Sequence, residues 1–118
     1  MSVGPFIDPA HADAALDSAS AGPVAEGNVG GGTGMICHEF KCGIGTASRR
    51  VTAAGGSYTV GVLVQANYGV RETLRIAGVP IGQELPVPPE VPVAKGDQGS
   101  IIIVVATDAP LLPHQLKR

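Results

Sequence analysis

The stretch Tyr58-Thr59-Val60-Gly61-Val62-Leu63-Val64-Gln65-Ala66-Asn67-Tyr68 decides the fold class of this chain. Because successive side chains of a β-strand point to opposite faces, one face would carry Tyr, Val and Ala, and the other Thr, Gly, Leu, Gln and Asn. Neither face is charged, so we expect both to be covered by helices or by a second sheet. The stretch therefore predicts a strand inside a layered α+β fold.

Further strands are expected on both sides of this one. Residues 44–51 read as a strand that is joined to it by a turn over 53–57, and residues 73–81 read as another short strand. The run 101–106 is purely apolar, which predicts a buried strand.

Helix signals lie near the two ends of the chain. Asp8 and Pro9 open an alanine-rich helix that we expect to reach residue 21, before a Gly-Pro stop. Asp108 and Pro110 predict the start of a second helix that carries three leucines. Between these helices, residues 85–93 hold four prolines, which predict an extended surface loop.

Composition excludes several classes of protein. The 118 residues carry 8 basic and 10 acidic side chains, a formal net charge of −2, which argues against a binder of nucleic acid or of anionic membranes. The apolar run 101–106 is too short to span a membrane, and no signal-peptide pattern follows Met1. Two cysteines are too few for a disulfide scaffold, so we expect a cytoplasmic protein. The 17 glycines and small apolar residues predict a marginal core, which suggests part of a larger unit.

The glycine-rich segment 30–34 does not fit a nucleotide-binding motif. In a G-x-G-x-x-G pattern the third glycine would fall at Met35 or Cys37, and no Gly-Lys-Ser/Thr ending is present. Two interpretations stay open: a tight turn, or small residues that let a substrate backbone lie close.

Cys37, His38 and Cys42 do not predict a metal site. Their spacing fits no standard zinc pattern, and neighbouring Cys37 and His38 would point to opposite faces of a strand. We interpret them as buried structural residues, and His11 and His114 as surface residues. The sequence predicts no cofactor and no metal.

The step Gly99-Ser100 is the first candidate for catalysis. If the bond between the two residues were cut, Ser100 would become an N-terminal residue at a strand end. Its free α-amine, with a pKa of about 7.7–8.0, could accept the proton of its own hydroxyl near neutral pH. The alternative is an ordinary serine at the start of a strand.

Asn67 is the second candidate. It ends the central strand, and its side-chain amide could donate to a developing oxyanion. The alternative is a turn asparagine that satisfies the local backbone.

Taken together, residues 22–35, 43–49, 58–69 and 96–103 resemble the DmpA-type aminopeptidases, the L-aminopeptidase/D-esterase and β-peptidyl aminopeptidase family. The most specific strings are Asn28-Val29-Gly30-Gly31-Gly32-Thr33-Gly34 and Gln65-Ala66-Asn67-Tyr68-Gly69. The resemblance implies a fragment of a four-layer αββα sandwich of the N-terminal-nucleophile hydrolase type. It implies a partial catalytic domain over 1–118, with 1–99 ending the α subunit and 100–118 opening the β subunit.

The same resemblance implies chemistry. Cleavage between Gly99 and Ser100 would expose Ser100 as the nucleophile, Asn67 would stabilise the oxyanion, and Gly31, Gly32 and Thr33 would contact the substrate. The substrates would be short peptides, amino-acid amides or esters, hydrolysed without a metal by an oligomer of cleaved heterodimers.

Departures from the family pattern leave two alternatives open. Cys42 stands where the family has Gly or Ala, and the family's tyrosine, serine and glutamate from flanking segments have no counterpart here. The isolated chain is therefore expected to be inactive, and an inactive truncated product is one alternative. An acyltransferase of the ornithine acetyltransferase type is the other, although that group uses Thr where this chain has Ser100.

Overall fold

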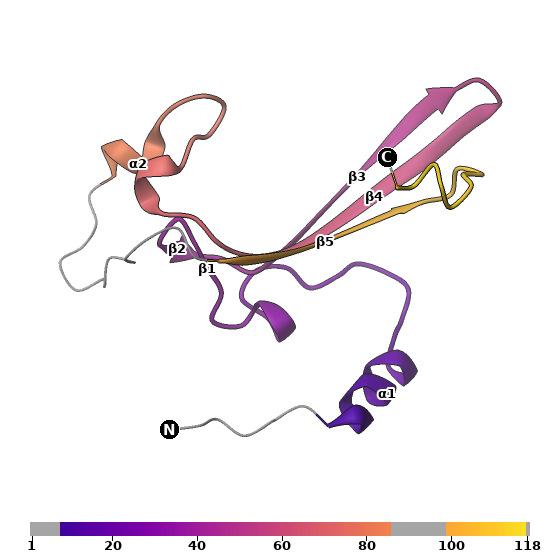
Figure 1. Ribbon diagram of the computed structural model, residues 1–118, viewed down its shortest axis with the longest axis horizontal. Coiled ribbons are helices and arrows are strands. Elements are labelled where there is room, and N and C mark those ends of the chain that lie inside the picture. Colours follow the sequence, from indigo (N-terminus) through magenta and orange to yellow (C-terminus); the bar gives the residue numbers. More distant parts are fainter. Residues whose placement is uncertain (1–7, 86–98, 118) are drawn as a thin grey trace.

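The computed structural model describes residues 8–85 and 99–117, which form helices and small antiparallel sheets (Figure 1). In chain order the elements are α1 (Pro9–Asp17), η1 (Gly30–Gly32), β1 (Ile36–Cys37), β2 (Phe40–Lys41), β3 (Ile44–Ala53), β4 (Gly56–Asn67), η2 (Arg71–Thr73), α2 (Ile81–Glu84) and β5 (Ser100–Thr107). Within the described residues, no helix has both the length and the apolar character needed to cross a membrane.

The larger sheet has the strand order β3-β4-β5, and both pairs are antiparallel. The predicted strands 44–51 and 58–68 are confirmed, and each extends further toward a two-residue turn at Ala54-Gly55. The predicted strand 101–106 is confirmed as β5. Because β4 is central, both of its neighbours can place side chains next to its last residues.

The smaller sheet is the hairpin β1–β2, which lies under the end of β4 (Figure 1). Its two loop residues, His38 and Glu39, have φ of 51° and 62°, as a type I′ turn requires. The sequence analysis placed Cys37 and His38 on one strand. That was wrong, because the strand ends at Cys37 and the chain reverses at His38.

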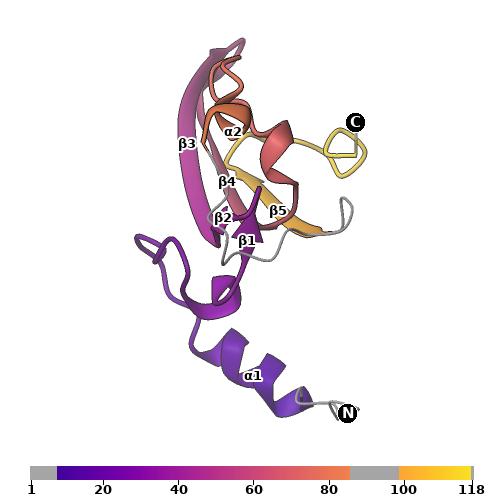
Figure 2. The same cartoon turned by 90° about the vertical axis from the view of Figure 1, so that its left-hand side faces the viewer.

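The expectation that both sheet faces are covered was wrong within the described residues. Ala66 is the one buried apolar residue among them, and the side chains of Ile101 to Val105 are 47–62% exposed. The reason is that nothing among residues 8–85 and 99–117 forms a second layer on the sheet: α1 buries no residue and stands apart from the strands in both views (Figure 1 and Figure 2). β5 is therefore a strand, but not a buried one.

The predicted helix over 8–21 is confirmed in type and start, but is shorter than expected. Asp8 caps it by accepting from the Ala10 N–H at 2.9 Å, and His11 Nδ1 accepts from the Asp8 N–H. The helix ends at Asp17, with Ser18 as the C-cap.

The predicted strand 73–81 is wrong. Ala77 and Gly78 take φ of 50° and 84°, so the chain turns back between Ile76 and Val79, which form an isolated bridge. The turn then leads into α2.

The predicted helix from Asp108 is also wrong. The Asp108 carboxylate accepts from the Thr59 N–H on β4 at 2.6 Å, and residues 108–117 form bends and turns. Pro113 would remove a hydrogen bond inside such a helix. Of the predicted loop 85–93, residues 86–93 lie outside the described residues.

Candidate functional site

The sheet brings the two predicted catalytic residues together. Asn67, the last residue of β4, and Ser100, the first residue of β5, are direct cross-strand partners. Directly opposite residues of an antiparallel pair have Cβ atoms about 4.5–5.5 Å apart on one face. The pairing therefore places both side chains on one face of the sheet, where they line the same cavity, although the two residues are far apart in the sequence.

The residue before Ser100 has room only for a glycine. A Cβ on Gly99 would lie 2.5 Å from the Asn67 carbonyl oxygen and 2.7 Å from the Tyr68 Cβ. Real Cβ atoms do not approach other atoms so closely, so any side chain at 99 would push the backbone away from β4. The lack of a side chain at Gly99 therefore keeps the Gly99–Ser100 peptide close to Asn67.

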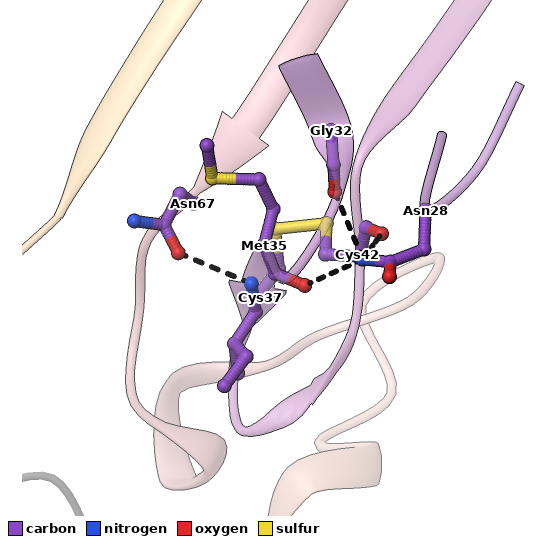
Figure 3. The surroundings of a disulfide bond; sticks show 7 residues. Asn28, Gly32, Met35, Cys37, Cys42 and Asn67 are labelled. Atoms are coloured by element: carbon purple, nitrogen blue, oxygen red, sulfur yellow. Dashed lines mark hydrogen bonds between the residues drawn. A yellow bond between two sulfur atoms is a disulfide. The ribbon is translucent and has the colours of Figure 1, made fainter. Parts of the chain in front are cut away.

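A single hydrogen bond fixes the orientation of the Asn67 amide. The Ile36 N–H of β1 donates to Asn67 Oδ1 at 3.1 Å, drawn as a dashed line in Figure 3. A backbone N–H can only donate, so the oxygen of the amide must face Ile36. The Nδ2 group is left as a donor on the other side, which is the polarity that stabilisation of an oxyanion requires.

Ser100 borders two cavities. The smaller, of about 100 Å³, is lined by Met35, Gln65, Asn67, Ser100, Ile101 and Ile102. The other is more open, of about 510 Å³, and is lined by Tyr68, Gly99, Ser100 and Ile101. Among residues 8–85 and 99–117, no side chain hydrogen-bonds the Ser100 hydroxyl. The described part of the chain thus supplies Ser100 with a candidate oxyanion donor but no side-chain base.

The glycine-rich segment is organised by Asn28, which the sequence analysis did not single out. Its Nδ2 donates to the carbonyl oxygens of Gly32 at 2.8 Å and Cys42 at 3.1 Å (Figure 3). Its Oδ1 accepts from the Gly34 N–H at 3.1 Å. The signal for it was its place in the string Asn28-Val29-Gly30. One amide therefore joins the glycine-rich segment to the residue that follows β2.

The three residues predicted to contact substrate occupy different positions. Gly31 is exposed and lies against the Gln65 side chain, which lines the smaller cavity. Gly32 is buried, and a Cβ there would lie 2.8 Å from the Gly27 carbonyl oxygen, so its role in the structure is packing. Thr33 is exposed at the end of η1. Gly31 is the one of the three that lies directly against a residue of the smaller cavity.

Cys37 and Cys42 form a disulfide across the β1–β2 hairpin. The prediction of buried structural cysteines is therefore corrected: both are half-buried, and they are bonded to each other. The signal was a spacing of five residues across a two-residue turn, which brings the two Cα atoms to 5.3 Å. No cluster of metal-ligating side chains occurs within the described residues.

His38 contacts Tyr68, the residue that lies against Gly99. Its N–H donates to the Tyr68 carbonyl oxygen at 2.9 Å, and its ring meets the Tyr68 ring edge-on with centroids 5.3 Å apart. Its Nδ1 lies 3.0 Å from the Val70 carbonyl oxygen and 3.2 Å from the Thr73 hydroxyl. These contacts give His38 a structural role beneath Tyr68.

Three ionised side chains make contacts outside the two cavities at Ser100. Glu39 and Arg71 form an ion pair at 3.5 Å in which both side chains are 7% exposed, and the Arg71 guanidinium lies 4.0 Å from the centre of the Phe40 ring. Glu26 accepts from the hydroxyl and the N–H of Thr46, which lowers the pKa of its carboxyl below 4.5. Sequence reasoning missed these contacts because each joins residues distant in the chain.

Comparison with known proteins places this geometry in a family. The family model described as Peptidase family S58 matches residues 4–118. The chain is 57% identical to beta-peptidyl aminopeptidase BapA of Sphingosinicella microcystinivorans over 128 aligned positions, which cover 98% of this chain and 32% of that protein.

Solved structures give the same result. A Burkholderia sp. beta-aminopeptidase superposes with a TM-score of 0.73 at 62% identity, over 95% of this chain and 30% of that one. The L-aminopeptidase D-Ala-esterase/amidase of Ochrobactrum anthropi, described as a variant of the Ntn-hydrolase fold, superposes with a TM-score of 0.77 at 55% identity, over 92% and 28%. The described residues thus have the fold of part of an Ntn hydrolase, and the chain spans about a third or less of the length of these relatives.

Proposed function

Since this chain belongs to peptidase family S58, we propose that it is the central part of a serine aminopeptidase that releases N-terminal amino acids from short peptides, amides or esters. The observation that carries the proposal is the pairing of Asn67 with Ser100 directly after a residue that must be glycine. Relatives named as beta-peptidyl aminopeptidase and as L-aminopeptidase D-Ala-esterase/amidase support this class of substrate.

The proposed first step is self-cleavage. The Ser100 Oγ attacks the Gly99 carbonyl carbon, the hydroxyl proton passes to the Ser100 nitrogen, and the bond from that carbon to the nitrogen breaks, which leaves an ester on Oγ and a free α-amine. Water then hydrolyses the ester, giving a Gly99 carboxylate and the free hydroxyl. Asn67 Nδ2 faces away from Ile36 and would donate to the oxyanion of each tetrahedral intermediate.

The proposed hydrolysis reuses the same groups. The Ser100 α-amine takes the hydroxyl proton as Oγ attacks the substrate carbonyl, and returns a proton to the leaving amine or alcohol. Water then attacks the acyl-enzyme, which releases the amino acid and restores the hydroxyl. No side chain within the described residues competes with the amine as the base for Ser100, and no metal is needed.

The proposal includes an architecture. Residues 1–99 would end the α subunit and 100–118 would begin the β subunit of one catalytic domain, a four-layer αββα sandwich in a homo-oligomer of cleaved heterodimers. The exposed apolar side chains of β5 support the covering layers, since such a strand is stable only when covered. A cytoplasmic location is also proposed; there the Cys37–Cys42 pair would be kept reduced.

The test is the variant Ser100→Ala in the full-length protein, followed by mass spectrometry and a peptide-hydrolysis assay. We expect one uncleaved chain without activity, whereas the wild type gives two chains split after Gly99. Ser57→Ala, at the far end of the β3–β4 hairpin, is the matched control and should be cleaved normally. A wild-type enzyme that is active with the 99–100 bond intact overturns the proposal.

A further inference from the structure

Gln65 is placed to reach a substrate, and its amide has no hydrogen-bond partner among residues 8–85 and 99–117. It lies on β4 two residues before Asn67, so both side chains lie on the same face, and its cross-strand partner is Ile102 of β5. It lines the smaller cavity together with Ser100 and Asn67. Within the described residues its amide makes no hydrogen bond, although the residue is half-buried.

The glycine loop holds the Gln65 amide in this position. A Cβ on Gly31 would overlap Gln65 Oε1 and would lie 3.2 Å from its Cδ. Gly31 takes no positive φ, and the atoms that a Cβ there would meet are the end of the Gln65 side chain, so a side chain at 31 would displace the Gln65 amide and leave the backbone in place. The absence of a side chain at 31 therefore leaves room for the Gln65 amide between the loop and β5.

The cavity has the size and polarity of one backbone group. Its volume of about 100 Å³ is that of roughly three water molecules, too small for a large side chain. Its polar groups are Gln65, Asn67 and Ser100, and its apolar walls are Met35, Ile101 and Ile102. A carboxamide offers one acceptor and one donor group, which match the N–H and C=O of a peptide unit.

The spacing of Gln65 and Asn67 along β4 indicates which peptide unit of a substrate would lie next to Gln65. Residues two apart on a strand are about 7 Å apart, so Gln65 lies about two residues along an extended substrate whose scissile carbonyl is at Asn67. An aminopeptidase substrate has only one residue on the amino side of that bond. The peptide unit next to Gln65 must therefore belong to the leaving group, where it is the second peptide unit, so the substrate needs at least four residues.

We propose that the Gln65 carboxamide binds the second peptide unit of the leaving group, and so makes the enzyme prefer tetrapeptides and longer peptides over amino-acid amides. This inference rests on the proposed function of Ser100. It also reassigns Gly31, which would act by making room for Gln65 and not by touching substrate.

The experiment compares two substrates on the full-length enzyme: a tetrapeptide, and the amide of its N-terminal amino acid, which has no peptide unit in its leaving group. Gln65→Ala should lower kcat/KM for the tetrapeptide about fivefold to tenfold, the loss typical of one hydrogen bond, and leave the amide unchanged. Gln83→Ala, an exposed residue of α2, is the matched control and should change neither. Self-cleavage should be complete in both variants.

The variant Gly31→Ala tests whether Gly31 acts through the Gln65 side chain. Its methyl group should displace the Gln65 amide and give a similar loss on the tetrapeptide, while the double variant Gly31→Ala, Gln65→Ala should be no worse than Gln65→Ala alone. Equal losses on both substrates, no loss on either, or additive losses in the double variant would each overturn the role of Gln65. Failure of the wild type to cleave itself or to hydrolyse either substrate would instead overturn the proposed function.

Discussion

At the scale of single residues, Asn67 shows what a sequence can and cannot provide. Its place at the end of a strand predicted an oxyanion donor, yet a turn asparagine fitted equally well. The structure adds the Ile36 N–H, which holds Oδ1 and leaves Nδ2 free to donate. That partner could not be predicted, because it comes from a hairpin joined to β4 only in the folded chain.

The first prediction concerns this donor. In the full-length enzyme, Asn67→Ala should lower kcat about 10²- to 10³-fold, the usual effect of removing one oxyanion donor. KM should change little, because the interaction forms mainly in the transition state. Steady-state kinetics on an amino-acid amide measure both constants. A variant that keeps wild-type kcat would show that Asn67 is a structural turn residue.

The second prediction concerns Gly99. Gly99→Ala should slow self-cleavage strongly, because the methyl group would meet the Asn67 carbonyl oxygen and Tyr68 and push the scissile bond away from the donor. The time course of chain splitting, followed by mass spectrometry from the fresh precursor, measures this effect. Gly45→Ala is the control, since a Cβ at 45 has no atom within 4 Å. Equal splitting rates in both variants would contradict the packing argument.

The third prediction concerns the pH dependence of Glu26. The hydrogen bonds from Thr46 hold the pKa of this carboxyl below 4.5, so they favour the folded state above that pH and are lost as the pH falls through the lowered pKa. NMR titration of the labelled carboxyl should show a pKa below 4.5. Thr46→Val removes the hydroxyl and should raise the pKa toward 4.5; an unchanged pKa in this variant would refute the assignment.

At the scale of elements, local signals were sufficient for some segments and misleading for others. Alternation over 58–68 and the cap at Asp8 predicted β4 and α1, because both patterns act within a few residues. The helix expected from Asp108 failed because a carboxylate that can cap a helix can equally accept from a neighbouring strand, here at Thr59. Sequence signals alone do not decide between two such partners.

The fourth prediction concerns the hairpin β1–β2. The Cys37–Cys42 disulfide closes a loop of separation 5, for which chain entropy gives about 2 kcal/mol of stabilisation. Reduction should therefore speed hydrogen exchange of the Ile36 N–H, the group that orients Asn67, by up to about thirtyfold. The Ala47 N–H on β3 serves as the control, and equal acceleration at both sites would mean that reduction loosens the whole sheet.

Alkylation of thiols in intact cells, followed by mass spectrometry, tests whether Cys37 and Cys42 are reduced or form the disulfide. Labelled Cys37 and Cys42 would agree with a cytoplasmic protein, where thiols stay reduced. Unlabelled cysteines would overturn the proposed location.

At the scale of the whole molecule, the pairing of Asn67 with Ser100 depends on a strand register that no local pattern reports. The sequence predicted both residues and both strands, but the register comes from packing across the sheet. The sequence also predicted covered faces, and the structure leaves them open. The alternation correctly predicted the strand β4, whereas the layers expected to cover it are not found among the described residues.

The last prediction follows from this open architecture. The radius of gyration is 18.3 Å, against about 13 to 14 Å for a compact domain of this length, and Ala66 is the one buried apolar residue that the structure describes. Burial of apolar surface is the main favourable term in folding, so these 118 residues alone should lack a cooperative thermal transition and should bind a hydrophobic dye such as ANS. Circular dichroism during heating, together with ANS fluorescence, measures both properties. A sharp melt whose calorimetric and van't Hoff enthalpies agree would show instead that the chain builds a core of its own.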